Sequence, residues 1–391
     1  MKLSKKLTSI LCAAALLVSA LPAAAAVVPV DDNKSQVLMN QAKSLEIVEQ
    51  IEASVNKDEE LKDAYAGVYL DDFGNLVVNY VGNNNRIKQQ ISKNCSTYAN
   101  SSNSVTYKEV DNNLVALTAE NQKCQNLLGE YGITSIELSI SKNCVIVTYQ
   151  DDSTLPFLYT QFDKKVVQFE KADPEMKAVF TTNILNGNAG SVYPNDTMFT
   201  IGCSAKKSSS GAKGVLVPGH LLAPNNTSIY YNGGNTVMGK ISGSQFSGGV
   251  DASFVQTNSN FTPTLKFADG SSYEYTSVDT GIYGLVEGLN VCMHGYVTSQ
   301  SFGKVLSTNY SESVNGVSMT GMVKCSYKAI HGDSGAGVTY DRYVGSASSK
   351  VSVIGLQSFS FLLNNGEWGD KSYACFSRID KIFNALGLED I

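Results

Sequence analysis

Ser334 stands in the sequence Gly332-Asp333-Ser334-Gly335, and all three histidines of the chain come before it. Glycines beside the serine let the backbone turn tightly and aim its N–H groups inward, as an activated serine requires. A serine becomes a good nucleophile only when a base removes its proton, and histidine is best suited to that at neutral pH. In α/β-hydrolases the histidine follows the serine, so this order excludes that fold.

The histidines are His220, His294 and His331. His220 ends the sequence Gly-Val-Leu-Val-Pro-Gly-His, in which an apolar strand runs into a turn of small residues. Asp251 precedes the strand-like sequence Ala-Ser-Phe-Val, where a carboxylate can be shielded from water. Such an acid holds an imidazole in the tautomer that a nucleophilic serine needs. The order His220, Asp251, Ser334 therefore predicts a catalytic triad.

The start of the sequence predicts export. Three lysines among the first six residues precede the apolar run 7–21, and Ala24-Ala25-Ala26 offers small residues for cleavage. We expect residues 1–26 to be a signal peptide and the chain to be secreted from a bacterium, with no membrane contact after cleavage. The net charge of −6 provides no basic face, so we expect no nucleic-acid partner.

Composition changes near residue 180. The part before it is rich in Lys, Glu, Asp and Gln, and its apolar pattern predicts helices near 38–55 and 114–128 and hairpins at 66–81 and 136–149. The part after it is rich in Gly, Ser, Thr, Asn and Tyr, which is typical of short strands in a sandwich or in closed barrels. A final helix is expected near 379–386, with Ser377 and Asp380 as its N-cap pair and Gly387 as its stop.

These residues resemble chymotrypsin-fold serine proteases of the small secreted bacterial type, the α-lytic protease and streptogrisin type. The resemblance is carried by three blocks, Gly214–His220, Asp251–Val255 and Gly332–Gly335, separated by intervals that suit compact barrels. It implies a mainly β, double antiparallel β-barrel protease domain with a C-terminal helix over residues 184–391. An α+β pro-region is implied over residues 27–183.

The resemblance also implies the roles of the site residues. Ser334 would be the nucleophile, His220 the general base and then acid, and Asp251 the carboxylate that orients the imidazole. Backbone N–H groups of Gly332 and Ser334 would form the oxyanion hole. The expected reaction is hydrolysis of a protein or peptide substrate through an acyl-serine, without metal or organic cofactor. The pro-region would assist folding and inhibit the enzyme.

By the same resemblance, six residues lie where the family builds its substrate pocket: Lys328, Ala329, His331, Ser358, Phe359 and Ser360. Phe359 and Ser360 replace positions that are often glycine in the family, which predicts a shallow pocket. Lys328 either favours an acidic substrate side chain or is simply solvated. His331 is either the rim of the pocket or plain surface.

Seven cysteines remain after the expected signal cleavage, so at least one is unpaired in any set of disulfides. The absence of any Cys-x-x-Cys spacing and the small number of histidines argue against a zinc site. The resemblance makes Cys325 and Cys375 the expected disulfide. Asp333 needs a positively charged partner because a buried unpaired carboxylate is costly. That partner is either an amino terminus freed near Ile184 or another side chain.

Two other functions fit the same residues. The fold could serve as a binding protein with weak or no catalytic activity, because the pocket residues are altered and Leu221 stands where the resemblance would place a cysteine, directly after His220. The same triad could also serve an esterase.

Overall fold

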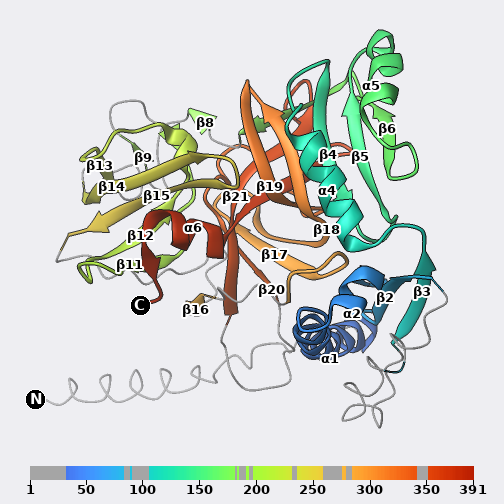
Figure 1. Ribbon diagram of the computed structural model, residues 1–391. Helices are drawn as coiled ribbons and strands as arrows, with labels where there is room; N and C mark the ends of the chain where they lie inside the picture. Colours follow the sequence, from blue (N-terminus) through green and yellow to red (C-terminus); the bar gives the residue numbers. More distant parts are fainter. Residues whose placement is uncertain are drawn as a thin grey trace, which may run out of the picture.

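The computed structural model describes residues 32–82, 89, 105–180, 183–184, 191–192, 197–230, 236–258, 275–278, 284–340 and 351–391. The expected signal peptide lies outside these residues. Among them, no helix combines the length and the apolar composition that crossing a bilayer requires. The chain is mainly β and begins with an α+β region (Figure 1).

The α+β region contains most of the helices. They are α1 (Asp32–Val55), α2 (Glu59–Ala64), α4 (Leu114–Gln125) and α5 (Leu155–Gln161), with a short 3-10 turn η1 (Asp152–Thr154). The strands are β1 (Tyr65–Leu70), β2 (Leu76–Val81), β3 (Thr106–Val110), β4 (Ile133–Ser139), β5 (Cys144–Tyr149), β6 (Val167–Lys171) and β7 (Met176–Phe180). Both predicted helices and both predicted hairpins are confirmed, because their patterns are local.

The next part of the chain forms a nine-stranded sheet in the order β23-β11-β12-β15-β14-β13-β9-β10-β8. Its strands are β8 (Asn183–Ile184), β9 (Ser191–Val192), β10 (Thr197–Met198), β11 (Ser204–Lys207), β12 (Lys213–Val217), β13 (Ser228–Tyr230), β14 (Val237–Ser247), β15 (Val250–Thr257) and β23 (Leu388–Glu389). A 3-10 turn, η2 (Gly219–Leu221), follows β12. Residues 199–203, between β10 and β11, form no strand.

A second group of strands closes on itself. It consists of β17 (Asn290–Gly295), β18 (Ser299–Val314), β19 (Val317–Cys325), β20 (Gly337–Tyr340), β21 (Val351–Leu363) and β22 (Tyr373–Arg378). Antiparallel pairing runs β17-β20-β21-β22-β19-β18 and returns from β18 to β17, so these six strands form a ring. A short strand β16 (Tyr275–Val278) pairs in parallel with β21.

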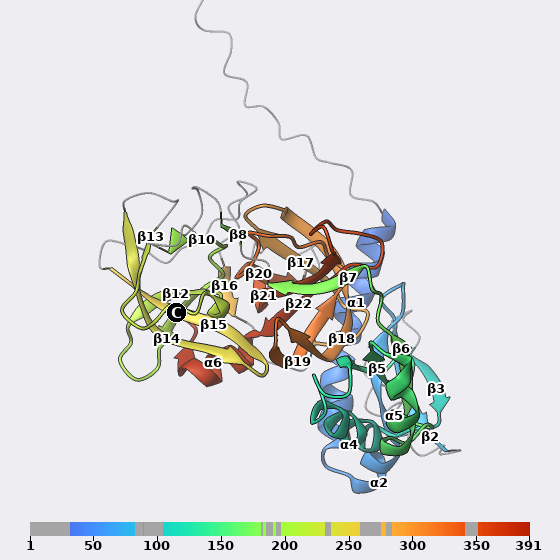
Figure 2. The ribbon, with the colours of Figure 1, turned by 90° about the horizontal axis from the view of Figure 1, so that it is seen from above.

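Two strands of the α+β region join this ring. Strand β4 pairs with β18, and β7 pairs with β21, both antiparallel. Figure 2 shows β7 lying along β21. Beyond β18, the sheet continues through β4, β5 and β6. The sequence pattern predicted the strands but not these partners, since pairing between distant segments leaves no local signal.

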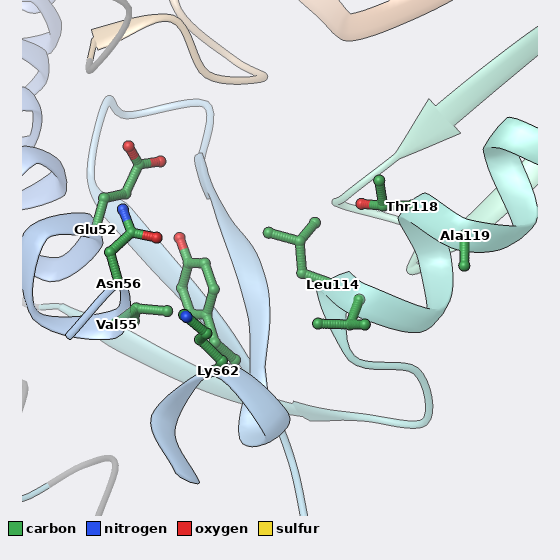
Figure 3. Close-up of a pocket in the computed structure, with 9 residues that line it drawn as sticks. Glu52, Val55, Asn56, Lys62, Leu114, Thr118 and Ala119 are labelled. Carbon is green, nitrogen blue, oxygen red and sulfur yellow. The ribbon is translucent and has the colours of Figure 1, made fainter. Parts of the chain in front are cut away.

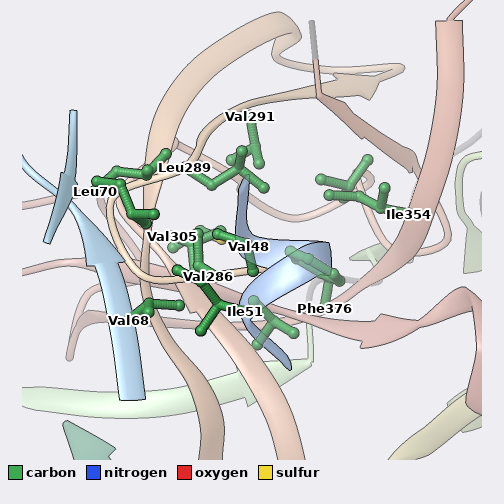
Figure 4. Close-up of a cluster of buried hydrophobic side chains, with 14 of the residues drawn as sticks. Val48, Ile51, Val68, Leu70, Val286, Leu289, Val291, Val305, Ile354 and Phe376 are labelled. Carbon is green, nitrogen blue, oxygen red and sulfur yellow. The ribbon is translucent and has the colours of Figure 1, made fainter. Parts of the chain in front are cut away.

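A buried apolar cluster is shared between the α+β region and the ring of strands (Figure 4). Val48 and Ile51 of α1 pack in the same cluster as Val291 of β17, Val305 of β18 and Phe376 of β22. Each such side chain contributes about 1.5–3 kcal/mol when it is fully buried. Separating the two parts would therefore expose a large apolar surface on both.

The last helix, α6 (Ile379–Leu386), ends as predicted at Gly387, which has a φ of 59°. The predicted cap is not formed. Arg378 is the N-cap and makes no side-chain cap bond, and its guanidinium binds Asp380 with two bonds of 3.0 Å. Ser377 is drawn away because its hydroxyl oxygen accepts a 3.0 Å bond from the backbone N–H of Asp251.

The expected disulfide between Cys325 and Cys375 is not present, and both thiols are buried and free. The register explains this. Lys324 lies opposite Cys375, and Cys325 lies opposite Ala374, so the two cysteines point to opposite faces of the β19–β22 pair. Burial raises the pKa of both thiols well above the ordinary value, which makes them poor nucleophiles.

Because these cysteines face apart, reductant is expected to leave the urea unfolding midpoint of the full chain unchanged. Thiol titration after denaturation without reductant should find both Cys325 and Cys375 reactive. A disulfide closing this loop would contribute about 2–4 kcal/mol, so a fall of that size on reduction would contradict the register described here.

Candidate active site

His220 is placed at the end of β12 by a sharp local turn. Pro218 fixes the backbone at the end of the strand, and His220 follows in η2. Gly219 is required there, because a Cβ at this position would lie 2.5 Å from the carbonyl oxygen of Gln245. The imidazole is thereby turned out of the sheet toward β15, and its side chain is only 3% exposed.

Asp251 lies near the start of β15, and its carboxylate contacts His220 at two atoms. One carboxylate oxygen is 2.6 Å from Nδ1 of His220, and the other accepts a 2.8 Å bond from the His220 backbone N–H. The carboxylate therefore fixes both the ring and the backbone of the histidine. The 31 residues that separate the two in sequence are bridged because β12 and β15 are neighbouring strands.

Asp251 is fully buried, and further bonds hold it as a carboxylate. The Ser358 hydroxyl donates to the oxygen that faces Nδ1, and the Asp251 backbone N–H donates to Ser377. Burial alone would raise the pKa of Asp251. The charge of His220 and the hydrogen bonds that the carboxylate accepts from His220 and Ser358 outweigh it and bring the pKa below the ordinary value of 3.8.

The loop that contains Gly332 and Ser334 is held by a threonine that was not identified from the sequence. The Thr200 hydroxyl donates a 2.8 Å bond to the Gly332 carbonyl, and its backbone N–H donates a 2.8 Å bond to the Ser334 carbonyl. Gly332 has a φ of 103°, a conformation that side chains disfavour. Thr200 lies between β10 and β11, in a segment that forms no strand.

Ser334 and His220 are brought together in one site without a hydrogen bond between them. The Ser334 hydroxyl donates a 3.3 Å bond to the Ser358 carbonyl. Nε2 of His220 is buried and has no hydrogen-bond partner among the described residues. Ser358 thus contacts both Asp251 and Ser334. It was predicted to line the pocket, and its hydroxyl faces the carboxylate instead.

The face of the His220 ring is covered by an aromatic residue of the α+β region. Phe180, the last residue of β7, stacks on the imidazole with ring centroids 4.7 Å apart and planes 29° apart. The Phe246 ring of β14 lies 5.1 Å from the Phe180 ring. Neither phenylalanine was assigned to the site from sequence: Phe180 lies 40 residues before His220, and Phe246, although only five residues before Asp251, belongs to none of the three blocks.

Asp333 is fully buried and is held by hydrogen bonds. Its carboxylate accepts bonds of 2.9 Å from the Val297 N–H and 3.0 Å from the Thr298 N–H, and the Thr298 hydroxyl also donates to it. The Ile330 N–H adds a 3.0 Å bond. These donors are backbone N–H groups and one threonine hydroxyl, and none of them is the positively charged partner that was expected from sequence.

Replacing Asp333 with asparagine is expected to lower the free energy of unfolding by about 2–4 kcal/mol, because an amide NH₂ would face donors that now have an acceptor. Urea unfolding of the full chain measures this loss. The matched control is Asp370→Asn, since Asp370 is exposed. A loss at Asp333 no greater than that at Asp370 would contradict the role assigned to these bonds.

Two pocket residues face each other across the expected substrate pocket. Ala329 and Ser360 are both fully buried, and the Ser360 hydroxyl donates a 2.9 Å bond to the Ala329 carbonyl. This bond joins the segment before the serine loop to β21. It leaves little room between the two walls for a substrate side chain.

The other pocket candidates lie apart from that bond. The Phe359 ring is buried among Tyr310, Met319 and Met322, on the side of β21 away from Ala329. Lys328 is exposed, which matches the solvated alternative, and its backbone N–H donates a 2.8 Å bond to Ser301. His331 is half-buried. His294 lies elsewhere, on β17, with Nε2 2.9 Å from the Thr339 hydroxyl.

A cavity of about 600 Å³ lies in the α+β region and contains none of the predicted site residues (Figure 3). It is bordered by α1, α2, β1 and α4. Burial raises the pKa of Glu52 in its wall to about 7. Its other lining residues are Val55, Asn56, Lys62, Tyr65, Leu114, Val115, Thr118 and Ala119.

Comparison with solved structures finds chymotrypsin-like bacterial serine proteases as structural neighbours over about half of the chain. Cellulomonas bogoriensis chymotrypsin is 20% identical and covers 53% of this chain and 98% of its own, with a TM-score of 0.41. Thermobifida fusca protease A is 22% identical, with coverages of 53% and 97% and a TM-score of 0.40. Nocardiopsis protease is 22% identical, with the same coverages and a TM-score of 0.41. No protein-family model and no curated protein sequence matches the chain.

Proposed function

We propose that the protein is a secreted serine endopeptidase made with a signal peptide and a pro-region, in which residues 184–391 form a two-barrel protease domain. The observation that carries the proposal is the 2.6 Å contact between Nδ1 of His220 and a fully buried Asp251. Burying a charged carboxylate is costly, and here it holds one particular ring nitrogen. That arrangement leaves Nε2 as the nitrogen that takes a proton from Ser334.

The reaction we propose has two steps. Ser334 attacks a peptide carbonyl, His220 takes the hydroxyl proton and passes it to the leaving amine, and water then hydrolyses the ester. The backbone N–H groups of Gly332 and Ser334 would stabilise the oxyanion. Gly332, at its positive φ, is held by Thr200, which supports a preformed donor pair.

We also propose that the α+β region is the pro-region and that it inhibits the site. Its strand β7 is paired with β21 and places Phe180 on the catalytic imidazole. A further contact supports a close fit. The Glu287 carboxylate accepts bonds of 2.7 and 2.9 Å from the backbone N–H groups of Ile140 and Ser141, at the end of β4. The shared apolar core is consistent with a role in folding.

A fluorophosphonate probe tests the proposal, because it reacts covalently with an activated serine. We expect the secreted chain to be labelled after removal of the pro-region, and Ser334→Ala to abolish labelling. Ser209→Ala is the matched control, since Ser209 is exposed. Absence of labelling in the processed native protein would contradict the endopeptidase.

The second candidate is a binding protein that keeps this fold without turnover. The observation in its favour is that Nε2 of His220 has no hydrogen bond within the described residues. The same probe separates the two, because a binding protein would remain unlabelled after processing. Hydrolysis of simple esters without hydrolysis of any peptide would point to an esterase instead.

A further inference from the structure

The Phe180 side chain is enclosed by three rings from the rest of the chain, which we call the aromatic nest: His220, Phe246 and Phe359. Ring centroids lie 4.7 Å from Phe180 for His220, 5.1 Å for Phe246 and 6.3 Å for Phe359. The two phenylalanines meet Phe180 at steep angles of 70° and 81°. Edge-to-face contacts of this kind favour an aromatic occupant beyond its apolar area.

The nest has a fixed position relative to the reacting serine. In the ladder between β7 and β21, Phe180 lies opposite Phe359 and Val179 lies opposite Ser360. In a peptide that continues this antiparallel pairing by one residue, the next residue would lie opposite Ser358. The Ser358 carbonyl is the group that holds the Ser334 hydroxyl at 3.3 Å. In a peptide bound as β7 is, the carbonyl nearest Ser334 therefore belongs to the residue that follows the aromatic one.

Side chains alternate between the two faces of a strand, so the side chain of that next residue would lie on the same face as Ser358 and Ser360. Ser360 and Ala329 are fully buried, and the 2.9 Å bond from the Ser360 hydroxyl to the Ala329 carbonyl ties the two sides of the expected pocket together. A large side chain would have to break this bond and leave a buried carbonyl unpaired, which is costly. The wall therefore favours a small residue directly before the cleaved bond.

We infer that the site selects peptides with an aromatic residue at the second position before the cleaved bond and a small residue at the first. The inference rests on the proposed endopeptidase function and names its substrate class. The chain carries one such sequence itself, Val179-Phe180-Thr181-Thr182, of which the first two residues belong to β7 and pair with β21. The first bond cut is then Thr181–Thr182. Ser334 forms an ester with the Thr181 carbonyl as the C–N bond breaks, the Thr182 amine takes the proton from His220, and water hydrolyses the ester.

The specificity is tested on the secreted, processed protein with two fluorogenic peptides that differ only at the second position before the cleaved bond. Both have threonine at the first position, and the second is phenylalanine or alanine. We expect kcat/KM to be about 10- to 100-fold higher for the phenylalanine peptide, as burial of an aromatic side chain predicts. Replacing the first-position threonine with phenylalanine should lower kcat/KM by a similar factor.

Variants test whether the aromatic nest causes the preference for phenylalanine over alanine. Phe246→Ala is expected to reduce the phenylalanine-to-alanine ratio by about tenfold, whereas Phe302→Ala keeps it. Phe302 is a suitable control because it is 53% exposed on β18. The ratio compares two substrates of one protein, so a partial loss of folded enzyme does not change it.

Mass spectrometry of the secreted chain provides the second readout. We expect a new amino terminus at Thr182 in the native protein, slower cleavage in Phe180→Ala, and an intact chain in Ser334→Ala. An active, probe-labelled enzyme with equal kcat/KM for the two peptides would overturn this inference and leave the proposed function standing. No labelling and no peptide cleavage would overturn both.

Discussion

Alanine in place of either Ser334 or His220 is expected to lower kcat/KM by about 10⁴- to 10⁶-fold, and the double variant should lose no more than the worse single variant. The reason is that the two side chains carry out one proton transfer. Without His220, the Ser334 hydroxyl stays protonated and weakly nucleophilic, and without Ser334 the imidazole has no proton to take. Effects of residues that act as a unit do not add.

Hydrolysis of the peptide with phenylalanine and threonine before the cleaved bond measures this loss in the secreted protein. Because the single variants cannot cut their own chain, the native enzyme is added to process them and then removed. Ser209→Ala is the control and should retain native kcat/KM. Losses that multiply in the double variant would show that the two residues act independently, which would contradict a triad.

The second large effect is expected from Asp251→Asn, which should lower kcat by about 10⁴-fold while the fold is retained. Asp251 accepts from Nδ1 of His220 on one oxygen and from the His220 backbone on the other. An amide that keeps the backbone bond presents its NH₂ to Nδ1. The ring proton then moves to Nε2, which can no longer accept a proton from Ser334.

Nitrogen NMR of the imidazole provides a readout that a merely structural role for Asp251 would leave unmoved. Near neutral pH, we expect the proton on Nδ1 in the native chain and on Nε2 in Asp251→Asn. Asp370→Asn, at an exposed position, should change neither kcat nor the tautomer. If Asp251→Asn retained the native kcat although its tautomer was reversed, Asp251 would not be needed for catalysis.

The elements that sequence predicted best were those whose signal is local. Helix α1 was predicted from apolar residues at three- and four-residue steps, and the hairpin of β4 and β5 from alternation around a polar turn. The triad was predicted from three short blocks and their order. The structure brings His220 and Asp251 into direct contact and places Ser334 beside the Ser358 that binds Asp251.

Prediction failed where the outcome depends on which face of a strand meets which neighbour. Cys325 and Cys375 are near each other on paired strands, yet a register one residue different from that needed for a disulfide turns them to opposite faces. Ser377 fits a helix cap by pattern, but its hydroxyl is taken by Asp251 from another sheet. Asp333 was expected to need a cation, whereas backbone donors of a neighbouring turn and one hydroxyl serve it.

By itself, the sequence determined the order of His220, Asp251 and Ser334 and the local turns that present them, because glycine, proline and apolar periodicity act over a few residues. Only the tertiary structure decided what covers the site. Phe180 reaches His220 because β7 pairs with β21, with Phe180 opposite Phe359 at a sequence separation of 359 − 180 = 179. Pairing of that kind is a property of the assembled sheet. Its hydrogen bonds form between backbone groups that nearly every residue has, so the sequence does not show which strands will pair.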